Sequence, residues 1–108
     1  MHPEIEEILL NFDFEYPFPA SVVLKNAERI LYYMDDINVE RISKFEYTPA
    51  GSLYILWNVE GIDFHIECLN NGRILYTFRS YQFGKAFGSD TIDQFIPRLE
   101  SYLLAGIC

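Results

Sequence analysis

The sequence predicts a single α+β domain, residues 1–108, in which two helices precede a four-stranded antiparallel meander and a third helix follows it. Three observations lead to this α-α-β-β-β-β-α order. Apolar residues recur at helical spacing near both ends of the chain, apolar and polar residues alternate through its middle, and glycine-containing turns separate the alternating runs. Because half of the 108 residues are hydrophobic, the chain can bury one core without disulfides or metal.

The first helix is expected over residues 3–10. Proline is favoured at the first helical position, and Ile5, Ile8 and Leu9 recur on one side. Residues 11–18 (NFDFEYPF) follow as an aromatic and acidic connector, and we expect its rings to hold the N-terminus against the core.

The second helix is expected from residue 19 to about residue 34. Its apolar side chains recur at the spacing of a helix that packs one side against a core. This stripe consists of Ala20, Val23, Ala27, Ile30, Leu31 and Met34. The polar residues expected to face solvent are Lys25, Asn26, Glu28 and Arg29.

Four strands are expected at residues 41–48, 52–60, 62–69 and 73–80, and three turns fix their register. A two-residue loop at Glu60-Gly61 pairs Val59 with Ile62, and three-residue loops with a left-handed glycine are expected at residues 49–51 and 70–72. A shift of one residue would turn the apolar side chains away from the core. Eight cross-strand pairs are expected on the core face. They are Trp57–Phe64, Ile55–Ile66, Leu53–Cys68, Cys68–Ile74, Ile66–Tyr76, Phe64–Phe78, Leu53–Tyr47 and Ile55–Phe45.

The C-terminal segment is expected to end in a helix. Residues 81–89 (YQFGKAFGS) are predicted to form a glycine-containing loop or a short edge strand, after which Asp90 can cap the helix. Pro97 conflicts with a regular helix, so the helix either kinks there, the interpretation we favour, or begins near it after extended residues 91–93. The helical spacing is carried by Ile92, Phe95, Ile96, Leu99, Tyr102 and Leu103.

A candidate partner-binding site is predicted on the sheet face opposite the core. His65 and Glu67 alternate with core residues, so they point to this face. The six predicted contact residues are Tyr54, Leu56, His65, Glu67, Leu75 and Thr77, with Ile42 as a further apolar candidate and Lys44, Glu46, Asp63 and Arg79 as a charged border. Large apolar side chains grouped in this way indicate a covered surface. The cover is a helix of the same chain, a second copy or another protein, and plain exposure is the remaining interpretation.

The FHIEC stretch at residues 64–68 does not predict a metal site. His65 and Glu67 supply at most two ligands, Cys68 points to the other face, and His2 is expected at a loose terminus. Zinc sites take three or four protein ligands, so we expect no metal.

Catalytic groups are not predicted either, and the protein is expected not to be an enzyme and to use no cofactor. Cys68 is expected to be buried, where a thiolate is disfavoured. Asp63 and Glu67 lie about 13 Å apart along one strand, farther than a glycosidase pair requires. The GKAFG segment at residues 84–88 lacks the Ser or Thr that follows the lysine of a phosphate-binding loop.

The charge balance limits the kind of partner. The net charge of −8, from sixteen acidic and eight scattered basic residues, argues against direct binding to nucleic acid and favours either a protein partner with a basic surface or simple solubility. The acidic start of the sequence lacks the basic region of a signal peptide, and no apolar run is long enough to cross a bilayer. With Cys68 and Cys108 expected as free thiols, a soluble cytoplasmic protein is predicted.

Three short motifs resemble those of a family of small uncharacterised bacterial and phage-borne proteins. Residues 11–13 (NFD) and 17–19 (PFP) are similar to its N-W-D-G-Y-G-A-P-P opening, and residues 48–57 (TPAGSLYILW) to its P-D-G-G-x-x-L-E-W hairpin. Residues 62–67 (IDFHIE) resemble its G-x-x-L-x-I-E strand, and the likeness spans about residues 9–80. The chain departs from the pattern at Phe12, at Leu56 and in the absence of the first glycines. The resemblance implies association with mobile elements and with toxin–antitoxin or defence loci, and it implies no catalytic residue.

These observations predict a non-enzymatic protein that binds another protein stoichiometrically, as antitoxins, immunity proteins and phage inhibitors of host defences do. The candidate site would make the contact, with acidic residues at its rim. A homodimeric structural subunit is one alternative. The other is a small-ligand or enzyme domain with a pocket between sheet and helices, lined by Tyr16, Tyr32, Tyr47 and Tyr76.

Overall fold

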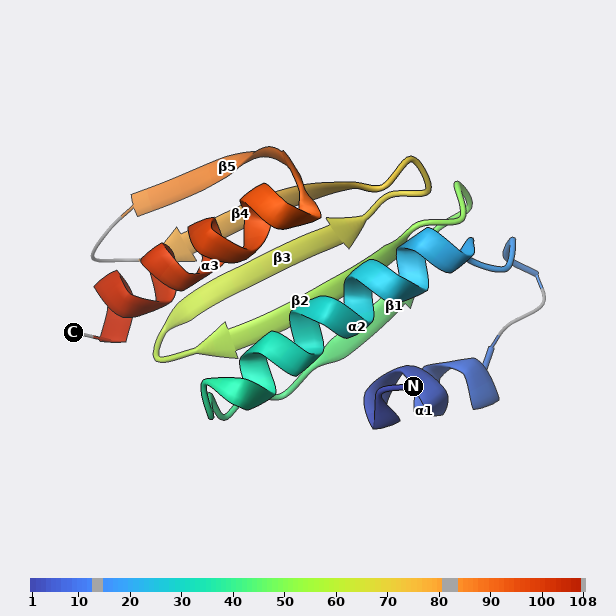
Figure 1. Ribbon diagram of the computed structural model, residues 1–108, viewed down its shortest axis with the longest axis horizontal. Helices are drawn as coiled ribbons and strands as arrows, with labels where there is room; N and C mark the ends of the chain where they lie inside the picture. The colour runs from blue at the N-terminus through green and yellow to red at the C-terminus, as the bar shows by residue number, and fades with distance from the viewer. Residues whose placement is uncertain (13–14, 81–83, 108) are drawn as a thin grey trace.

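The computed structural model describes residues 1–12, 15–80 and 84–107, and within these ranges it forms two layers, helices on one side and a single sheet on the other (Figure 1). The elements in chain order are α1 (Pro3–Leu10), α2 (Ser21–Asp36), β1 (Lys44–Tyr47), β2 (Leu53–Val59), β3 (Ile62–Cys68), β4 (Arg73–Ser80), β5 (Gly84–Thr91) and α3 (Ile92–Ile107). The strands are all antiparallel, in the spatial order β1-β2-β3-β4-β5. The predicted α+β class is confirmed, but the sheet has five strands rather than four.

The register of the first four strands is the one predicted. Val59 pairs with Ile62, Trp57 with Phe64, and every other expected core-face pair is present. The backbone of Glu60 and Gly61 is left-handed, with φ of 51° and 79°, as a two-residue hairpin turn requires. Gly51 and Gly72, with φ of 80° and 87°, close the two longer turns.

The fifth strand is the alternative that the sequence left open for residues 81–89. Residues 84–91 pair with β4 along their whole length, and residues 81–83 lie outside the described part of the chain. The strand was hard to recognise because its core-side residues, Ala86 and Gly88, are small. Gly88 has a packing reason, since a Cβ atom there would lie 2.6 Å from the hydroxyl oxygen of Tyr76.

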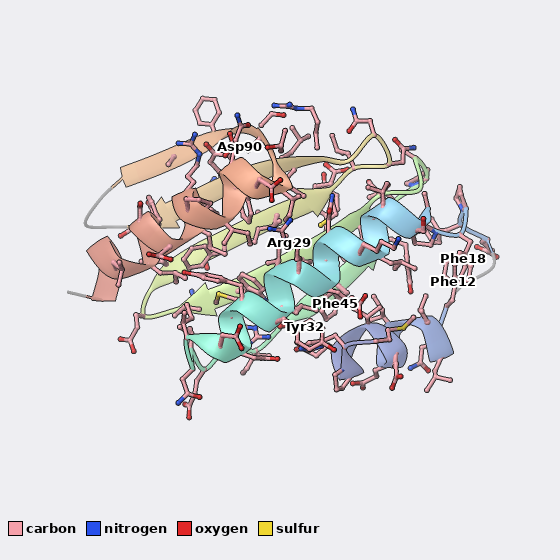
Figure 2. The ribbon with its side chains drawn as sticks, in the orientation of Figure 1. Phe12, Phe18, Arg29, Tyr32, Phe45 and Asp90 are labelled. Carbon is pink, nitrogen blue, oxygen red and sulfur yellow. The ribbon has the colours of Figure 1, made fainter. Side chains whose placement is uncertain are left out.

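The core lies between the sheet and the helices α2 and α3. The apolar side chains of the core face are buried, and their rings pack on one another, with the Phe64 and Phe78 centroids 5.0 Å apart. Phe95 of α3 reaches down to Tyr76, with centroids 5.7 Å apart. An ion pair of 2.8 Å between Arg29 of α2, which is labelled in Figure 2, and Asp93 of α3 links the two helices at the surface.

Two residues of α2 differ from the prediction. Ala20 precedes the helix and is exposed, so it does not belong to the apolar stripe. Asn26, expected to face solvent, is buried and donates a hydrogen bond from Nδ2 to the carbonyl oxygen of Gly72 at 3.2 Å. An amide side chain at this position therefore ties α2 to the β3–β4 turn.

The third helix begins earlier than one of the two predictions allowed. It starts at Ile92 and continues through Pro97, so a start near Pro97 is wrong. The cap is also different: Thr91 Oγ1 accepts from the Gln94 N–H, and Gln94 Oε1 accepts from the Thr91 N–H, which is a reciprocal cap. The buried carboxylate of Asp90 (Figure 2) instead accepts from Arg98 Nε at 2.6 Å.

The N-terminus is held firmly, which corrects the expectation of a loose end. His2 is 4 % exposed, and its Nε2 lies 2.6 Å from Asp35 Oδ2 at the end of α2. His2 Nδ1 accepts from the Glu4 N–H, so Nε2 carries the proton and donates to the carboxylate. Arg41 joins the cluster, with ion pairs of 3.1 Å to both Asp35 and Glu4.

The connector after α1 is anchored by aromatic contacts, as predicted. The ring centroid of Phe12 lies 5.1 Å from that of Phe18 and 4.8 Å from that of Tyr47 in β1 (Figure 2). The Tyr47 hydroxyl also donates to the carbonyl oxygen of Ile8 at 2.7 Å. The connector and α1 are thus attached to the helical side of β1.

Candidate functional site: the outer face of the sheet

The sheet has an outer face, the side opposite α2 and α3. Neighbouring strands alternate in register, so every second residue of each strand belongs to it. It consists of Lys44, Glu46, Tyr54, Leu56, Asn58, Asp63, His65, Glu67, Arg73, Leu75, Thr77, Arg79, Lys85, Phe87, Ser89 and Thr91.

All six predicted contact residues lie together on this face. Leu56, His65 and Thr77 form one row across the three central strands. Tyr54, Glu67 and Leu75 form the next row. Five of the six, all except Leu56, line a shallow hollow of about 260 Å³.

The helices do not cover this face. In the described ranges, α2 packs on β2 and β3, α3 packs on β4 and β5, and α1 packs on α2, all on the other side of the sheet (Figure 1). Cover by a helix of the same chain, one of the interpretations left open by the sequence, is therefore wrong for the described residues. Leu75 is 39 % exposed, and Ile42, just before β1, is 81 % exposed.

A hydrogen-bonded chain fixes the carboxylate of Glu67. The Ser52 hydroxyl donates to Glu67 Oε2 at 2.5 Å, and the Ser52 and Thr48 hydroxyl oxygens lie 2.6 Å apart. Tyr54 lies directly opposite Glu67 on the neighbouring strand. Burial first, and then the charge of Glu67, raise the pKa of the Tyr54 hydroxyl. Glu67 is thus an acceptor held in a fixed position.

Phe87 of β5 belongs to the same face and was not predicted. It lies directly opposite Thr77 and extends the Leu56–His65–Thr77 row to the sheet edge. Its side chain is 73 % exposed, and Lys85 Nζ lies 5.6 Å from the ring centroid. The alternation of Lys85, Phe87 and Ser89 was the available signal, but the small residues between them concealed the strand.

The charge of the outer face differs from that of the whole chain. The face holds four of the eight basic residues of the chain and three of the sixteen acidic ones, so it carries +1 while the whole chain carries −8. The acidic residues are concentrated elsewhere, for example Glu4, Glu28, Asp36 and Glu100 on the helices. The predicted border of Lys44, Glu46, Asp63 and Arg79 is present on the face, and acidic residues at the rim of a contact stay a prediction.

The residues considered for chemistry do not form a common site. His65 is exposed on the outer face, whereas Cys68 is buried on the inner one, where burial first and the charge of Glu67 second raise the pKa of its thiol to about 12. Asp63 accepts from Asn58 Nδ2, away from the Glu67 chain. Across residues 1–12, 15–80 and 84–107, no three His, Cys, Asp or Glu side chains are grouped so as to hold a metal ion.

The four tyrosines of the small-ligand alternative are dispersed. Tyr76 packs between Phe78 and Phe95 in the core, Tyr47 contacts Phe12, and the Tyr32 ring contacts His2. Tyr16 lies in the exposed connector. The structure thus does not bring these residues together around one cavity.

The comparisons with known proteins add no relative: no protein-family model, curated protein or solved structure matches the chain. The resemblance of residues 9–80 to small phage-borne proteins stays a prediction. In the part of the chain that the structure describes, the helices lack the length and apolar character needed to cross a membrane.

Proposed function

We propose that the protein is a non-enzymatic binding module that associates stoichiometrically with another protein through the outer face of its sheet. Antitoxins, immunity proteins and phage-encoded inhibitors of host defence act in this way. The observation that carries the proposal is the apolar centre of the face, Tyr54, Leu56, Leu75 and Phe87, which the described helices leave uncovered. Apolar side chains grouped on a surface mark interaction sites in soluble proteins.

Different residues of the face supply affinity and orientation. Leu56, Leu75 and Phe87 would be desolvated by a partner, and such contacts at the centre of an interface supply most of its binding free energy. Glu67 would orient the partner, because Ser52 already holds its carboxylate and little side-chain entropy is lost on binding. His65 and Thr77 supply further hydrogen-bonding groups between the apolar residues.

The experiment compares three variants in association with a partner from the native host. Leu56→Asp and Leu75→Asp place a charge in the apolar centre, and Leu104→Asp, on an exposed leucine of α3, is the matched control. We expect the wild type to form a complex of fixed stoichiometry, the first two variants to bind at least about tenfold more weakly, and the control to bind normally. Circular dichroism confirms that each variant folds.

Equal binding by all folded variants would overturn the proposal. Light scattering of the pure protein at two concentrations and at raised salt gives the second readout. A mass that doubles with concentration, and that Leu56→Asp returns to that of one chain, would assign the face to a homodimer instead.

A further inference from the structure

The positive charge of the outer face is concentrated on its last two strands. We call this part the β4–β5 strip, and it consists of Arg73, Leu75, Thr77, Arg79, Lys85 and Phe87. Arg79 lies directly opposite Lys85, and Thr77 lies opposite Phe87. The strip therefore holds three basic side chains around an apolar centre, and Asp63 and Glu67 of β3 lie beside Arg79 and Leu75.

The strip ends at an unpaired strand. β5 is last in the order of the sheet, so no strand of the described chain pairs with its far side, although the Ser89 carbonyl oxygen already accepts a hydrogen bond from Arg73 Nη2 at 2.8 Å. It is eight residues long and contains no proline. A long edge of this kind is a template for another strand, and the charged residue that it carries, Lys85, is of the type with which natural proteins discourage pairing by unsuited strands.

We propose that the free edge of β5 binds an extended acidic segment of a partner protein as a sixth strand of the sheet. This inference rests on the proposed function and names the partner's chemistry. Backbone hydrogen bonds to β5 would supply part of the affinity, as in other cases of strand addition. Alternate side chains of the added strand would lie beside Lys85, Phe87 and Ser89, so a carboxylate would face Lys85 and an apolar side chain would face Phe87.

The charges distinguish this occupant from a second copy of the chain. A pair of β5 strands from two copies would bring Lys85 of both copies to one edge, and neither lysine would gain a carboxylate from the outer face of the other strand. An acidic strand would place a carboxylate beside Lys85.

The unpaired edge likewise distinguishes a protein strand from single-stranded nucleic acid. A nucleic acid could stack a base on Phe87, but it offers no ladder of N–H and C=O groups to the edge of β5. The residues outside the outer face carry a net charge of −9 and would repel a long polyanion, whereas a peptide carries its charge only along the strip.

The test uses a labelled peptide, TEVITEV, whose two glutamates and central isoleucine share one face of an extended strand. The control peptide TKVITKV differs only in charge. We expect TEVITEV to bind the full chain at least about tenfold more tightly than TKVITKV in fluorescence anisotropy, and raised salt to weaken the binding. Hydrogen exchange should slow at alternate amides of β5 and stay unchanged in β1.

Variants connect the binding to the strip. Lys85→Glu and Arg79→Glu should reduce TEVITEV affinity at least about tenfold, and Lys25→Glu, on the exposed side of α2, should leave it unchanged. The inference is overturned if TEVITEV does not bind, or if both peptides bind equally. It is also overturned if an oligothymidylate binds where TEVITEV does not, or if the amides of β5 become protected by raised protein concentration alone.

These outcomes separate the two proposals. If TEVITEV fails while Leu56→Asp still abolishes association with the host partner, the binding face stands and the edge inference falls. If TEVITEV binds while Leu56→Asp leaves host association intact, the edge is a binding site and the apolar centre is not.

Discussion

The two faces of one sheet are built from the same strands and yet have opposite environments. On β3, Phe64 is fully buried under the helices while its neighbour His65 is exposed. On β4, buried Tyr76 and Phe78 alternate with half-buried Thr77 and exposed Arg79. The backbone geometry is shared, so the difference comes only from which side each residue points to.

Packing restricts the residues of the inner face and leaves those of the outer face unrestricted. An inner residue must fit the volume between sheet and helices, because interiors are packed as densely as organic crystals. An outer residue meets no such demand from its own chain. A large apolar side chain such as Leu75 or Phe87 on that face therefore needs an explanation outside the fold, and the binding proposal supplies one.

The largest expected difference between the faces is in thiol reactivity. In a Cys108→Ser background, Cys68 reports on the inner face and an added Thr77→Cys reports on the outer one. Burial, aided by the charge of Glu67, raises the pKa of Cys68 from 9.0 to about 12, so at neutral pH its thiolate fraction falls about a thousandfold. We expect Cys68 to react with a disulfide reagent at least about a thousandfold more slowly than the outer thiol.

Denaturant supplies the control for this pair of thiols. Both should react at similar rates once the chain is unfolded, because burial no longer distinguishes them. Rapid reaction of Cys68 in the native protein would contradict the buried placement.

The next largest effect is on stability. Phe64→Ala removes a ring whose centroid lies 5.0 Å from Phe78 and 6.2 Å from Trp57, so we expect a loss of about 3–5 kcal/mol in the free energy of unfolding. Leu75→Ala on the outer face should cost less than about 1 kcal/mol. Urea unfolding measures both. Similar losses would mean that the isolated protein already covers its outer face, for example in a dimer.

A smaller effect on stability is expected when the inner and outer sides of β5 are compared. Gly88→Ala adds a methyl group that meets the Tyr76 hydroxyl at 2.6 Å, and the Tyr76 ring is confined by Phe78 and Phe95. We expect a loss of about 1–3 kcal/mol from overpacking. Lys85→Ala, on the outer side of the same strand, should change stability by less than about 0.5 kcal/mol. If Gly88→Ala is neutral in urea unfolding, the tight contact with Tyr76 is absent in solution.

The sequence predicted those parts of the fold in which local and long-range patterns agree. The register of β1–β4 followed from alternation combined with glycines that need positive φ, because a shift of one residue would expose the entire core face. The same register brought the six outer-face residues together correctly. Alternation gave no such guide in β5, where Ala86 and Gly88 replace the usual apolar residues on the inner side.

The contacts of single polar residues could not be predicted from the sequence pattern. Asn26 and His2 are buried by hydrogen bonds to Gly72 and Asp35, residues distant in the chain, and no periodicity marks such partners. The charge of the outer face was missed for a related reason. The net charge is a sum over the whole chain and does not say where the charges lie. Which charges share the outer face depends on how the five strands are aligned.

The smallest expected effect concerns α1, which belongs to neither face and is held partly by the His2–Asp35–Arg41 cluster. Burial acts to raise the pKa of Asp35, but hydrogen bonds from His2 and Arg41 outweigh it, so the pKa is held below its usual 3.8. A carboxylate with a lowered folded pKa stabilises the protein above its unfolded pKa, and this contribution is lost as the pH falls through the folded value. The side chain is 47 % exposed, so solvent screening limits the contribution to less than about 1 kcal/mol.

The pH dependence of Asp35→Asn tests this attachment. We expect the wild type to exceed the variant in free energy of unfolding at neutral pH, and the difference to shrink as the pH falls below 3.8. Asp36→Asn, one residue along the same helix and exposed, is the matched control. A difference that stays constant down to low pH would contradict an ionised Asp35 in the cluster. Because Glu4 shares Arg41 with Asp35, Glu4→Gln in the same series would show whether the cluster acts as a unit or as separate pairs.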